Sequence, residues 1–483
     1  MEEFFHASNY VYARMIFDQS LAFLYFIAFL SAFNQFPALL GTKGLLPVEE
    51  FIARRDFKSA PSLFHWKYSD SILKAVCVIG MILGLLIASG LMQNAPILLH
   101  MMTWLTLYGL YLSIVNVGQD FYGFGWETMI LEAGFFAAFM GPHWVTPSWI
   151  PILIIRWMLF RTEMGAGLIK LRGDSCWRDL TCLYYHHETQ PLPNPLSRFF
   201  HHGPKPFHRF GVVFSHFCQL VAPLGLFLPP PIASIAGGFL IFHQLILVIS
   251  GNYSWLNWIT IVLGTVCVHD GVFSASVQTT PPPLWFEIIQ YGIGLLALGL
   301  SYRPLLNLFS ENQYMNYSWN RWHLVGAYGA FGSVTKERYE VVLEGTNEDQ
   351  PGSQTKWLEY GFKGKPVELD RTPPIVAPYH LRLDWMIWFL PFTVMVSGNR
   401  IHVRGHSLWF IRLMSKLLSN DSKLLSLFRK NPFEKDPPRW VRASFYHYQF
   451  TAAGEPNVWK RKYLGEFCPP LSRSMVEELF ENV

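Results

Sequence analysis

The chain has 483 residues, of which 51% are hydrophobic, 16% are aromatic and only 15% are charged. This composition is too apolar for an ordinary soluble enzyme and is typical of an integral membrane protein. The formal net charge is only +4, and the basic residues are scattered among acidic ones. A nucleic-acid partner is therefore not expected.

The N-terminal tail, residues 1–19, precedes a long apolar run that predicts a retained membrane anchor. Its charges, Glu2, Glu3 and Arg14, are unlike the basic start of a cleavable signal peptide. A helix needs roughly 20 apolar residues to cross about 30 Å of hydrocarbon, which predicts nine spans. Residues 75–119 form two of these spans, with a break at 93–96. The other seven are 20–40, 121–141, 151–171, 211–228, 232–249, 255–268 and 284–300.

Three polar regions interrupt or follow these spans. They are a loop at 43–74, a loop at 172–210 and the segment 301–483. The last region has strand-like runs at 338–343, 356–362 and 443–450, while 383–396 is too short to span comfortably and is typical of a core element or an interfacial helix. The predicted fold is a polytopic α-helical membrane protein with a β-rich C-terminal soluble domain.

Nine spans would place the three polar regions on one side of the membrane. Lys and Arg in both loops favour the cytoplasm for that side. Two candidate N-glycosylation sequons, at Asn316 and Asn420, favour the lumen instead. The residues alone leave the two orientations open.

Charged residues also occur inside the predicted spans. Arg156, Glu163 and Lys170 recur every seven residues and so share one stripe of a helix, and the preceding span holds Glu127 and Glu132 as candidate partners. Charges in a membrane normally face the protein interior and pair. We predict a structural ion pair between Glu127 and Arg156 rather than a proton relay. For Arg161 and Lys170, the alternative is that the side chains extend to the interface.

The stretch CWRDLTCLYYHHETQPLPNPLS, residues 176–197, combines two cysteines with two histidines. Zinc bound by Cys176, Cys182, His186 and His187, a disulfide between the cysteines, and free thiols all remain open. The gap of five residues between the cysteines is longer than usual for zinc. No nucleophile elbow, H-E-x-x-H motif, dinucleotide fingerprint or P-loop occurs, so no catalytic, cofactor or metal residue is predicted.

Several long strings resemble the lipase maturation factor family. The likeness runs from the first span to Pro470. The strings are GAGLIK at 165–170 followed by RGD, CWRDLTC and HHETQPLPNP; NVG at 116–118, FGWE at 124–127 and LEAGF at 131–135; YGAFGSVTKERYEVVLEGT at 328–346; APYHLRLDWMIWF at 377–389; and NPFEKDPPRWVRA at 431–443.

The resemblance implies a multi-pass protein of the endoplasmic reticulum membrane that helps secreted homodimeric lipases, of the lipoprotein lipase kind, to reach their active form. It implies a client-specific chaperone rather than an enzyme, with a lumenal C-terminal domain. Chaperones or oxidoreductases of the reticulum are expected as further partners, and membrane lipid surrounds the spans. The candidate client-binding residues are Trp177, Tyr184, Tyr185, His186, His187, Trp385 and Trp388.

A second hypothesis comes from a different class of protein. It is a membrane thiol-redox or lipid-modifying enzyme that uses Cys176 and Cys182, or the intramembrane pair Lys170 and Glu127. The two hypotheses differ in whether the cysteines exchange electrons with a substrate or only shape a loop. Sequence alone does not separate them.

Overall fold

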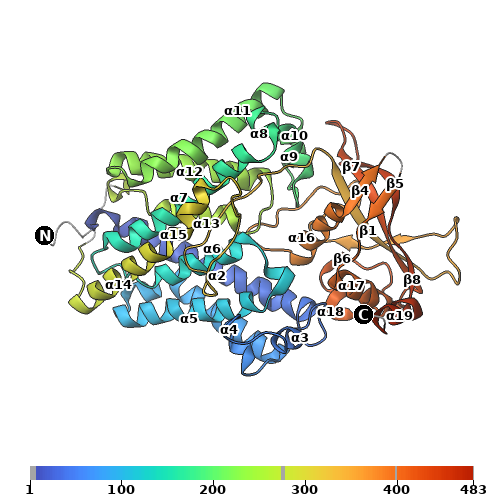
Figure 1. Cartoon of the computed structure of the whole chain (residues 1–483), viewed down its shortest axis with the longest axis horizontal. Helices are drawn as coiled ribbons and strands as arrows, with labels where there is room; N and C mark the ends of the chain where they lie inside the picture. Colours follow the sequence, from blue (N-terminus) through green and yellow to red (C-terminus); the bar gives the residue numbers. More distant parts are fainter. Residues whose placement is uncertain (1–6, 274–277, 398–399, 482–483) are drawn as a thin grey trace.

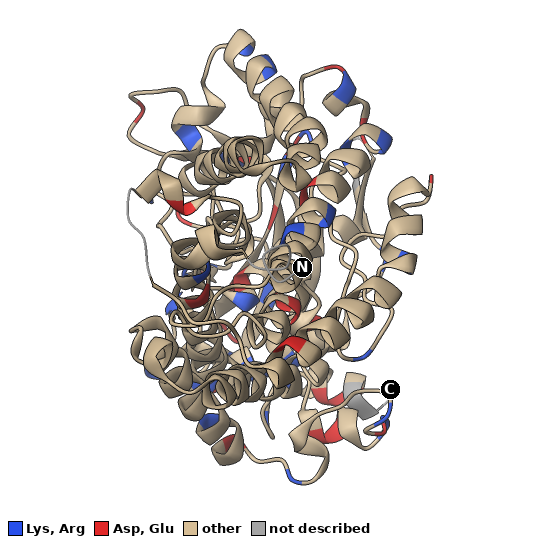
Figure 2. Ribbon diagram, turned by 90° about the vertical axis from the view of Figure 1, so that its left-hand side faces the viewer, with Lys and Arg blue, Asp and Glu red and all other residues tan. Residues whose placement is uncertain are grey.

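The computed structural model describes residues 7–273, 278–397 and 400–481 and divides them between helices and a sheet (Figure 1). Helices from the first two thirds of the chain lie side by side at one end, and the strands lie at the other end. Most of the ribbon in Figure 2 is uncharged, and its acidic and basic positions are scattered. The predicted fold class, a multi-pass helical membrane protein with a β-containing C-terminal region, is confirmed.

Six helical segments in the described ranges are long and apolar enough to cross a membrane: Ser8–Leu39, Asp70–Ala88, Ile97–Asn116, Lys205–Phe227, Pro230–Ser250 and Leu284–Phe309. Local sequence marks where two of the long helices begin. The hydroxyl of Ser69 accepts a hydrogen bond from the Ile72 amide, and that of Ser148 accepts one from the Ile150 amide. Each hydroxyl thereby satisfies a backbone N–H that the first helical turn leaves free.

The helical part contains these elements: η1 (Ser8–Tyr10), α2 (Val11–Leu39), α3 (Val48–Ile52), η2 (Leu63–His65), α4 (Asp70–Ala88), η3 (Leu91–Asn94), α5 (Ile97–Asn116), η4 (Gln119–Tyr122), α6 (Gly125–Ala137), α7 (Trp149–Arg172), α8 (Ser175–Arg178), α9 (Leu183–Thr189), α10 (Ser197–His201), α11 (Lys205–His216), η5 (Phe217–Val221), η6 (Ala222–Phe227), α12 (Pro230–Ser250), α13 (Leu256–Thr265), η7 (Asp270–Phe273), α14 (Leu284–Leu300) and α15 (Tyr302–Phe309). Helices occur within all nine predicted spans, as far as the chain is described.

The count of nine spans is nevertheless not confirmed. Helix α6 has 13 residues and α13 has 10, which at 1.5 Å per residue gives about 20 Å and about 15 Å, too short to cross as a helix. Helix α7 is long enough, with 24 residues, but carries five charged side chains. Most of the residues of all three helices are buried among neighbouring elements, which explains how they accommodate polar groups.

The C-terminal region is built on an antiparallel sheet of four strands in the order β2, β1, β7, β8. In the β1–β7 ladder Val342 lies opposite Ser444. Two further strand pairs, β3 with β6 and β4 with β5, and four short helices complete the region. The elements are β1 (Arg338–Thr346), β2 (Leu358–Glu359), β3 (Gly361–Phe362), α16 (Arg382–Phe389), η8 (Leu390–Thr393), β4 (Val394–Ser397), β5 (Arg400–Val403), α17 (Leu408–Leu418), α18 (Ser422–Leu425), β6 (Phe428–Lys430), β7 (Trp440–Phe450), β8 (Trp459–Ser472) and α19 (Arg473–Glu481).

The three polar regions meet at one end of the helical part. From the first loop, Glu50 accepts hydrogen bonds of 3.0 Å from Arg412 of α17. From the second loop, the Glu188 carboxylate accepts a 2.7 Å bond from the Phe450 amide at the end of β7. Both loops therefore lie against the C-terminal region, while a common side of the membrane for all three stays a prediction.

Candidate functional site

The loop at 172–210 is fixed by a disulfide between Cys176 and Cys182, whose Cα atoms are 4.8 Å apart. Both cysteines are buried, and they pack with Trp177 and Val212 in a small hydrophobic cluster of their own. The indole N–H of Trp177 also donates a 2.8 Å hydrogen bond to the carbonyl of Phe331. The disulfide thus closes the beginning of the loop on itself, and Trp177 attaches it to the segment that leads into β1.

The side chains of the two histidines contact groups other than the cysteines. His186 Nε2 is 2.8 Å from the hydroxyl of Tyr253, and His187 stacks on the ring of Phe200. Burial, assisted by the nearby charge of Lys170, lowers the pKa of His186 to about 3. The zinc alternative loses its thiolate ligands to the disulfide, and within the described ranges no three potential metal-ligating side chains gather.

Backbone carbonyls of the same loop hold the C-terminal sheet in place. The guanidinium of Arg338, at the start of β1, donates to the carbonyls of Glu188 (2.9 Å) and Gln190 (2.5 Å). Arg198 and His202 bond the carbonyl of Thr451, just beyond β7. The loop therefore joins the membrane helices to the sheet, and its central stretch, residues 186–194, is buried.

This burial corrects the predicted client-binding surface. Trp177, His186, His187 and Trp385 are at most 6% exposed, so an exposed surface made from these four residues is wrong. Their aromatic and apolar atoms instead fill the junction between helices and sheet. Part of the surface of the remaining candidates is accessible: Tyr184, Tyr185 and Trp388.

The predicted pairing of Glu127 with Arg156 is also wrong. Glu127 pairs with Arg382 of α16, at 2.7 Å, and accepts a 2.5 Å hydrogen bond from Tyr111. Arg156 donates instead to the carbonyls of Leu226 and Val266, and its guanidinium faces aromatic rings. Sequence reasoning missed Arg382 because it comes 255 positions after Glu127, and no local spacing connects the two.

Glu132, the second acidic residue of α6, forms a buried ion pair with Arg161. It also accepts hydrogen bonds from the Tyr328 hydroxyl at 2.7 Å and the Gly326 amide at 2.8 Å. Arg161 is 1% exposed and Lys170 is 6% exposed, so neither side chain extends to the membrane interface as the sequence alternative proposed.

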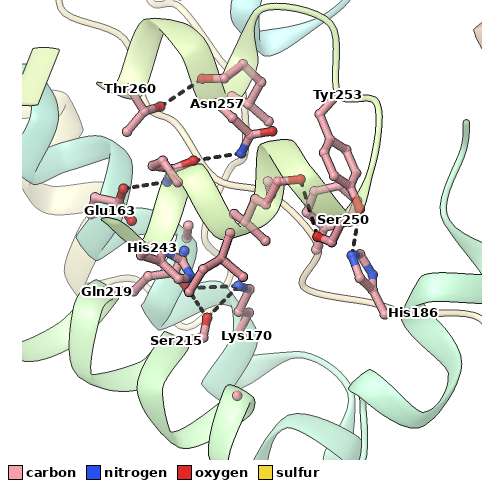
Figure 3. A pocket seen from close by; sticks show the side chains of 18 of the residues that line it. Glu163, Lys170, His186, Ser215, Gln219, His243, Ser250, Tyr253, Asn257 and Thr260 are labelled. Atoms are coloured by element: carbon pink, nitrogen blue, oxygen red, sulfur yellow. Dashed lines mark hydrogen bonds between the residues drawn. The ribbon is translucent and has the colours of Figure 1, made fainter. Parts of the chain in front are cut away.

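Lys170 and Glu163 face one cavity of about 170 Å³ between α7, α9, α11, α12 and α13 (Figure 3). The Nζ atom of Lys170 donates to Gln219 at 2.8 Å. Glu163 accepts a 2.7 Å bond from Gln244, which in turn accepts one of 2.6 Å from Asn257. Apolar side chains make up most of the remaining wall. No sequence motif predicted this cavity, because its walls come from helices that are distant in the chain.

The candidate sequons differ in accessibility. Asn316 is exposed. Asn420 is half-buried, and its side-chain N–H group donates a 2.8 Å hydrogen bond to the Phe433 carbonyl. A glycan on Asn420 would require this bond to break, whereas Asn316 offers the more accessible acceptor.

Comparison with known proteins gives matches over nearly the whole chain. Residues 12–275 match the lipase maturation factor transmembrane domain, and residues 324–469 match the lipase maturation factor C-terminal domain. The chain belongs to the lipase maturation factor family. It is 39% identical to lipase maturation factor 1 of Bos taurus, over 99% of this chain and 92% of that protein.

Other members of the lipase maturation factor family align similarly. Lipase maturation factor 1 of Homo sapiens is 38% identical over 99% of this chain and 91% of its own length. Lipase maturation factor 2 of Homo sapiens is 26% identical over 95% of this chain and 82% of its own length. No solved structure matches the chain. Family membership supports a role in lipase maturation and agrees with the resemblance seen in the sequence.

Proposed function

We propose that the protein is a multi-pass factor of the endoplasmic reticulum membrane that helps secreted homodimeric lipases to fold and assemble. The match to lipase maturation factor 1 over 99% of the chain carries this proposal. The buried Cys176–Cys182 disulfide supports a lumenal position for the 172–210 loop, because disulfides persist in oxidising compartments. The C-terminal region, which packs on that loop, then also faces the lumen.

We infer that the protein acts by binding its client rather than by catalysis. The two cysteines are 6% and 0% exposed, so a client thiol does not reach them unless the loop opens. Glu127 and Lys170, the other pair considered for catalysis, belong to different sites, since Glu127 is bound by Arg382. A binding role requires an accessible surface instead.

An apolar surface on the C-terminal region suits such a client. We name it the α16–β4 surface, and it consists of Phe389, Phe392, Met395 and Val396, which are 38–50% exposed. Trp388 lies against Phe389 and Phe392 and adds a partly accessible ring. Contiguous exposed apolar residues outside the membrane are typical of a protein-binding site, and incompletely folded lipases expose apolar residues as well.

Secretion of a lipoprotein-lipase-type enzyme from cells lacking their own maturation factor tests this function. The full-length chain should restore lipase activity in the medium, and lipase should co-purify with it. A Phe392→Ser, Met395→Ser variant should reduce both, whereas Ile375→Ser, at a position that is 78% exposed elsewhere in the region, should reduce neither. Unchanged secretion with the full-length chain present would contradict the proposed function.

A further inference from the structure

The cavity beside α7 combines a buried cation with an apolar wall. Lys170 is the single Lys or Arg among the described residues that line it. We propose that this cavity binds an amphiphile with one anionic head group and one apolar chain, with the head group at Lys170. This ligand site is separate from the α16–β4 surface and does not depend on the proposed function.

Among the described residues, Lys170 forms hydrogen bonds only with neutral side chains, and the charge of Glu163 acts on it from a longer distance. Its Nζ atom donates to Gln219 at 2.8 Å and to Ser215 at 3.4 Å, and it lies 4.5 Å from the centre of the Trp177 ring. No carboxylate in the described ranges comes within 4.0 Å of it, although the buried Arg161 and Arg382 each have one. Because an unpaired buried charge is costly, an anion beside Lys170 would gain a charge-assisted hydrogen bond.

Glu163 is the acidic group in the same cavity. It lies seven residues before Lys170 on α7, which is about 10 Å along the helix axis. Its Oε1 atom is held by Gln244, whereas its buried Oε2 atom has no hydrogen-bond partner. Gln219 lies near both Lys170 and Glu163, so a head group at Lys170 would be within reach of the Glu163 charge, and neutralising Glu163 should favour an anion there.

The imidazoles in the wall add polarity. Burial lowers the pKa of His186 to about 3, and it lowers the pKa of His187 well below its ordinary value, so both are neutral near pH 7. The buried Nδ1 atoms of His187 and His243 lack hydrogen-bond partners. These polar atoms point to a ligand with hydrogen-bonding oxygens rather than to a purely apolar guest.

The wall near α11 fits the apolar part of the ligand. Phe207 and Phe210 line the cavity and are also 50% and 66% exposed, so they form its mouth. The enclosed volume of about 170 Å³ is close to that of a cavity that holds a benzene-sized guest. This space accommodates one head group and the start of one chain, with the rest of the chain against the aromatic mouth.

Photo-crosslinking of the purified full-length protein in non-ionic detergent tests the site. The probe is a palmitic acid analogue with a diazirine and an alkyne, and the labelled peptides are mapped by mass spectrometry. We expect labels on peptides from α9 or α11. Excess palmitate or lysophosphatidate should compete, and their relative strength distinguishes a carboxylate from a phosphate head group. Hexadecylamine, which carries the opposite charge, should compete about ten-fold less well.

Four variants separate the roles of charge and shape. Lys170→Met should lower labelling about ten-fold, while Glu163→Gln should preserve or increase it. Gly211→Leu should block the mouth, because even a Cβ atom at this position would lie 2.8 Å from a methyl group of Leu183. Lys205→Met, at an exposed position on α11, is the matched control and should label normally.

The proposal is overturned if the amine competes as well as the acids do, or if Lys170→Met and Gly211→Leu label like the unmodified protein. Equal labelling of all variants would indicate binding at the lipid-facing surface only. If Lys170→Met does not yield monodisperse protein, Gly211→Leu and the acid and amine competition decide the matter. Lipase secretion is not a readout here, so failure of this site and failure of the proposed function are distinguishable.

Discussion

Helix α6 and the cavity beside α7 bury charged groups in different ways. Glu127 and Glu132 on α6 each contact a guanidinium and a tyrosine hydroxyl, so their charges are compensated within the protein. In the described part of the chain, Lys170 forms hydrogen bonds only with neutral side chains, and Glu163 acts on it through its charge without forming an ion pair within 4.0 Å. The charges of Glu127 and Glu132 are satisfied by protein groups, whereas the charge of Lys170 can still form an ion pair with a bound anion.

Breaking the Glu127–Arg382 pair should have the largest effect. Arg382→Met leaves the Glu127 carboxylate buried without its cation, at a cost of about 3–5 kcal/mol in unfolding free energy. The yield of monodisperse protein and the thermal unfolding midpoint in detergent should both fall sharply. Combining Glu127→Gln with Arg382→Met should recover part of the loss, because no lone charge then remains.

The matched control for this pair is Arg412→Met, since Arg412 pairs with Glu50 at a partly exposed site. Removing that pair should cost at most about 1 kcal/mol, because solvent screens it. Equal losses for the two arginine variants would show that the buried pair contributes no more than a surface pair. The buried Glu127–Arg382 pair would then not differ in its effect on stability from a charge pair at the surface.

Removal of the disulfide should cause the next largest loss of unfolding free energy. Replacing Cys176 and Cys182 with serine should lower the unfolding free energy by about 2 kcal/mol, as expected for a closed loop this short. Lipase secretion should fall only in proportion to the loss of folded protein. A reductant should lower the unfolding midpoint of the unmodified protein and not that of the variant. Loss of secretion at normal protein levels would favour thiol chemistry instead.

The buried histidines predict a dependence on pH. The folded pKa of His186 is about 3 and its ordinary value is 6.5, so below pH 6.5 the unfolded chain binds a proton that the folded chain excludes. The contribution of neutral His186 to the unfolding free energy is complete above pH 6.5. It falls by about 1.4 kcal/mol for each pH unit below that, down to about pH 3. His186→Gln should flatten the decrease of the unfolding midpoint below pH 6.5. The exposed His402→Gln should not.

We expect the smallest change in unfolding free energy from a substitution of Lys170. Lys170→Met loses the contacts with Gln219, Ser215 and Trp177 but also removes a costly buried charge, so the two contributions partly offset and the unfolding free energy should change by only about 1 kcal/mol. The unfolding midpoints of Lys170→Met and Arg382→Met, measured side by side, test the comparison directly. A loss as large as that for Arg382→Met would mean that Lys170 is structural.

Patterns within one segment were predictable from the sequence. Apolar length located the long helices, and strand-like runs located two long strands, since 338–343 and 443–450 fall within β1 and β7. The run at 383–396 was expected to be a core element or an interfacial helix, and Leu383, Trp385 and Ile387 are indeed buried. These features depend on neighbours in the chain, and a sequence displays such neighbours directly.

Pairings between distant segments were not predictable. Arg382 reaches Glu127 because α16 packs against α6 through Trp385 and Trp126, whereas Arg156 bonds backbone carbonyls elsewhere. Other contacts between distant segments, with Val212 and Phe331, bury Trp177 and His186, which the sequence presents as aromatic and polar residues of a surface loop. The cavity has no signal in any one segment, because five helices each supply part of its wall.

The sequence by itself determined that this is a multi-pass membrane protein of the lipase maturation factor family with a β-containing C-terminal region, because hydrophobic length, alternation and family strings are properties of contiguous residues. Only the tertiary structure decided which buried charges are compensated. Coulomb energy and desolvation depend on distance in space, and it is the packing of α6, α7 and α16 that leaves Glu127 paired and Lys170 without an anion.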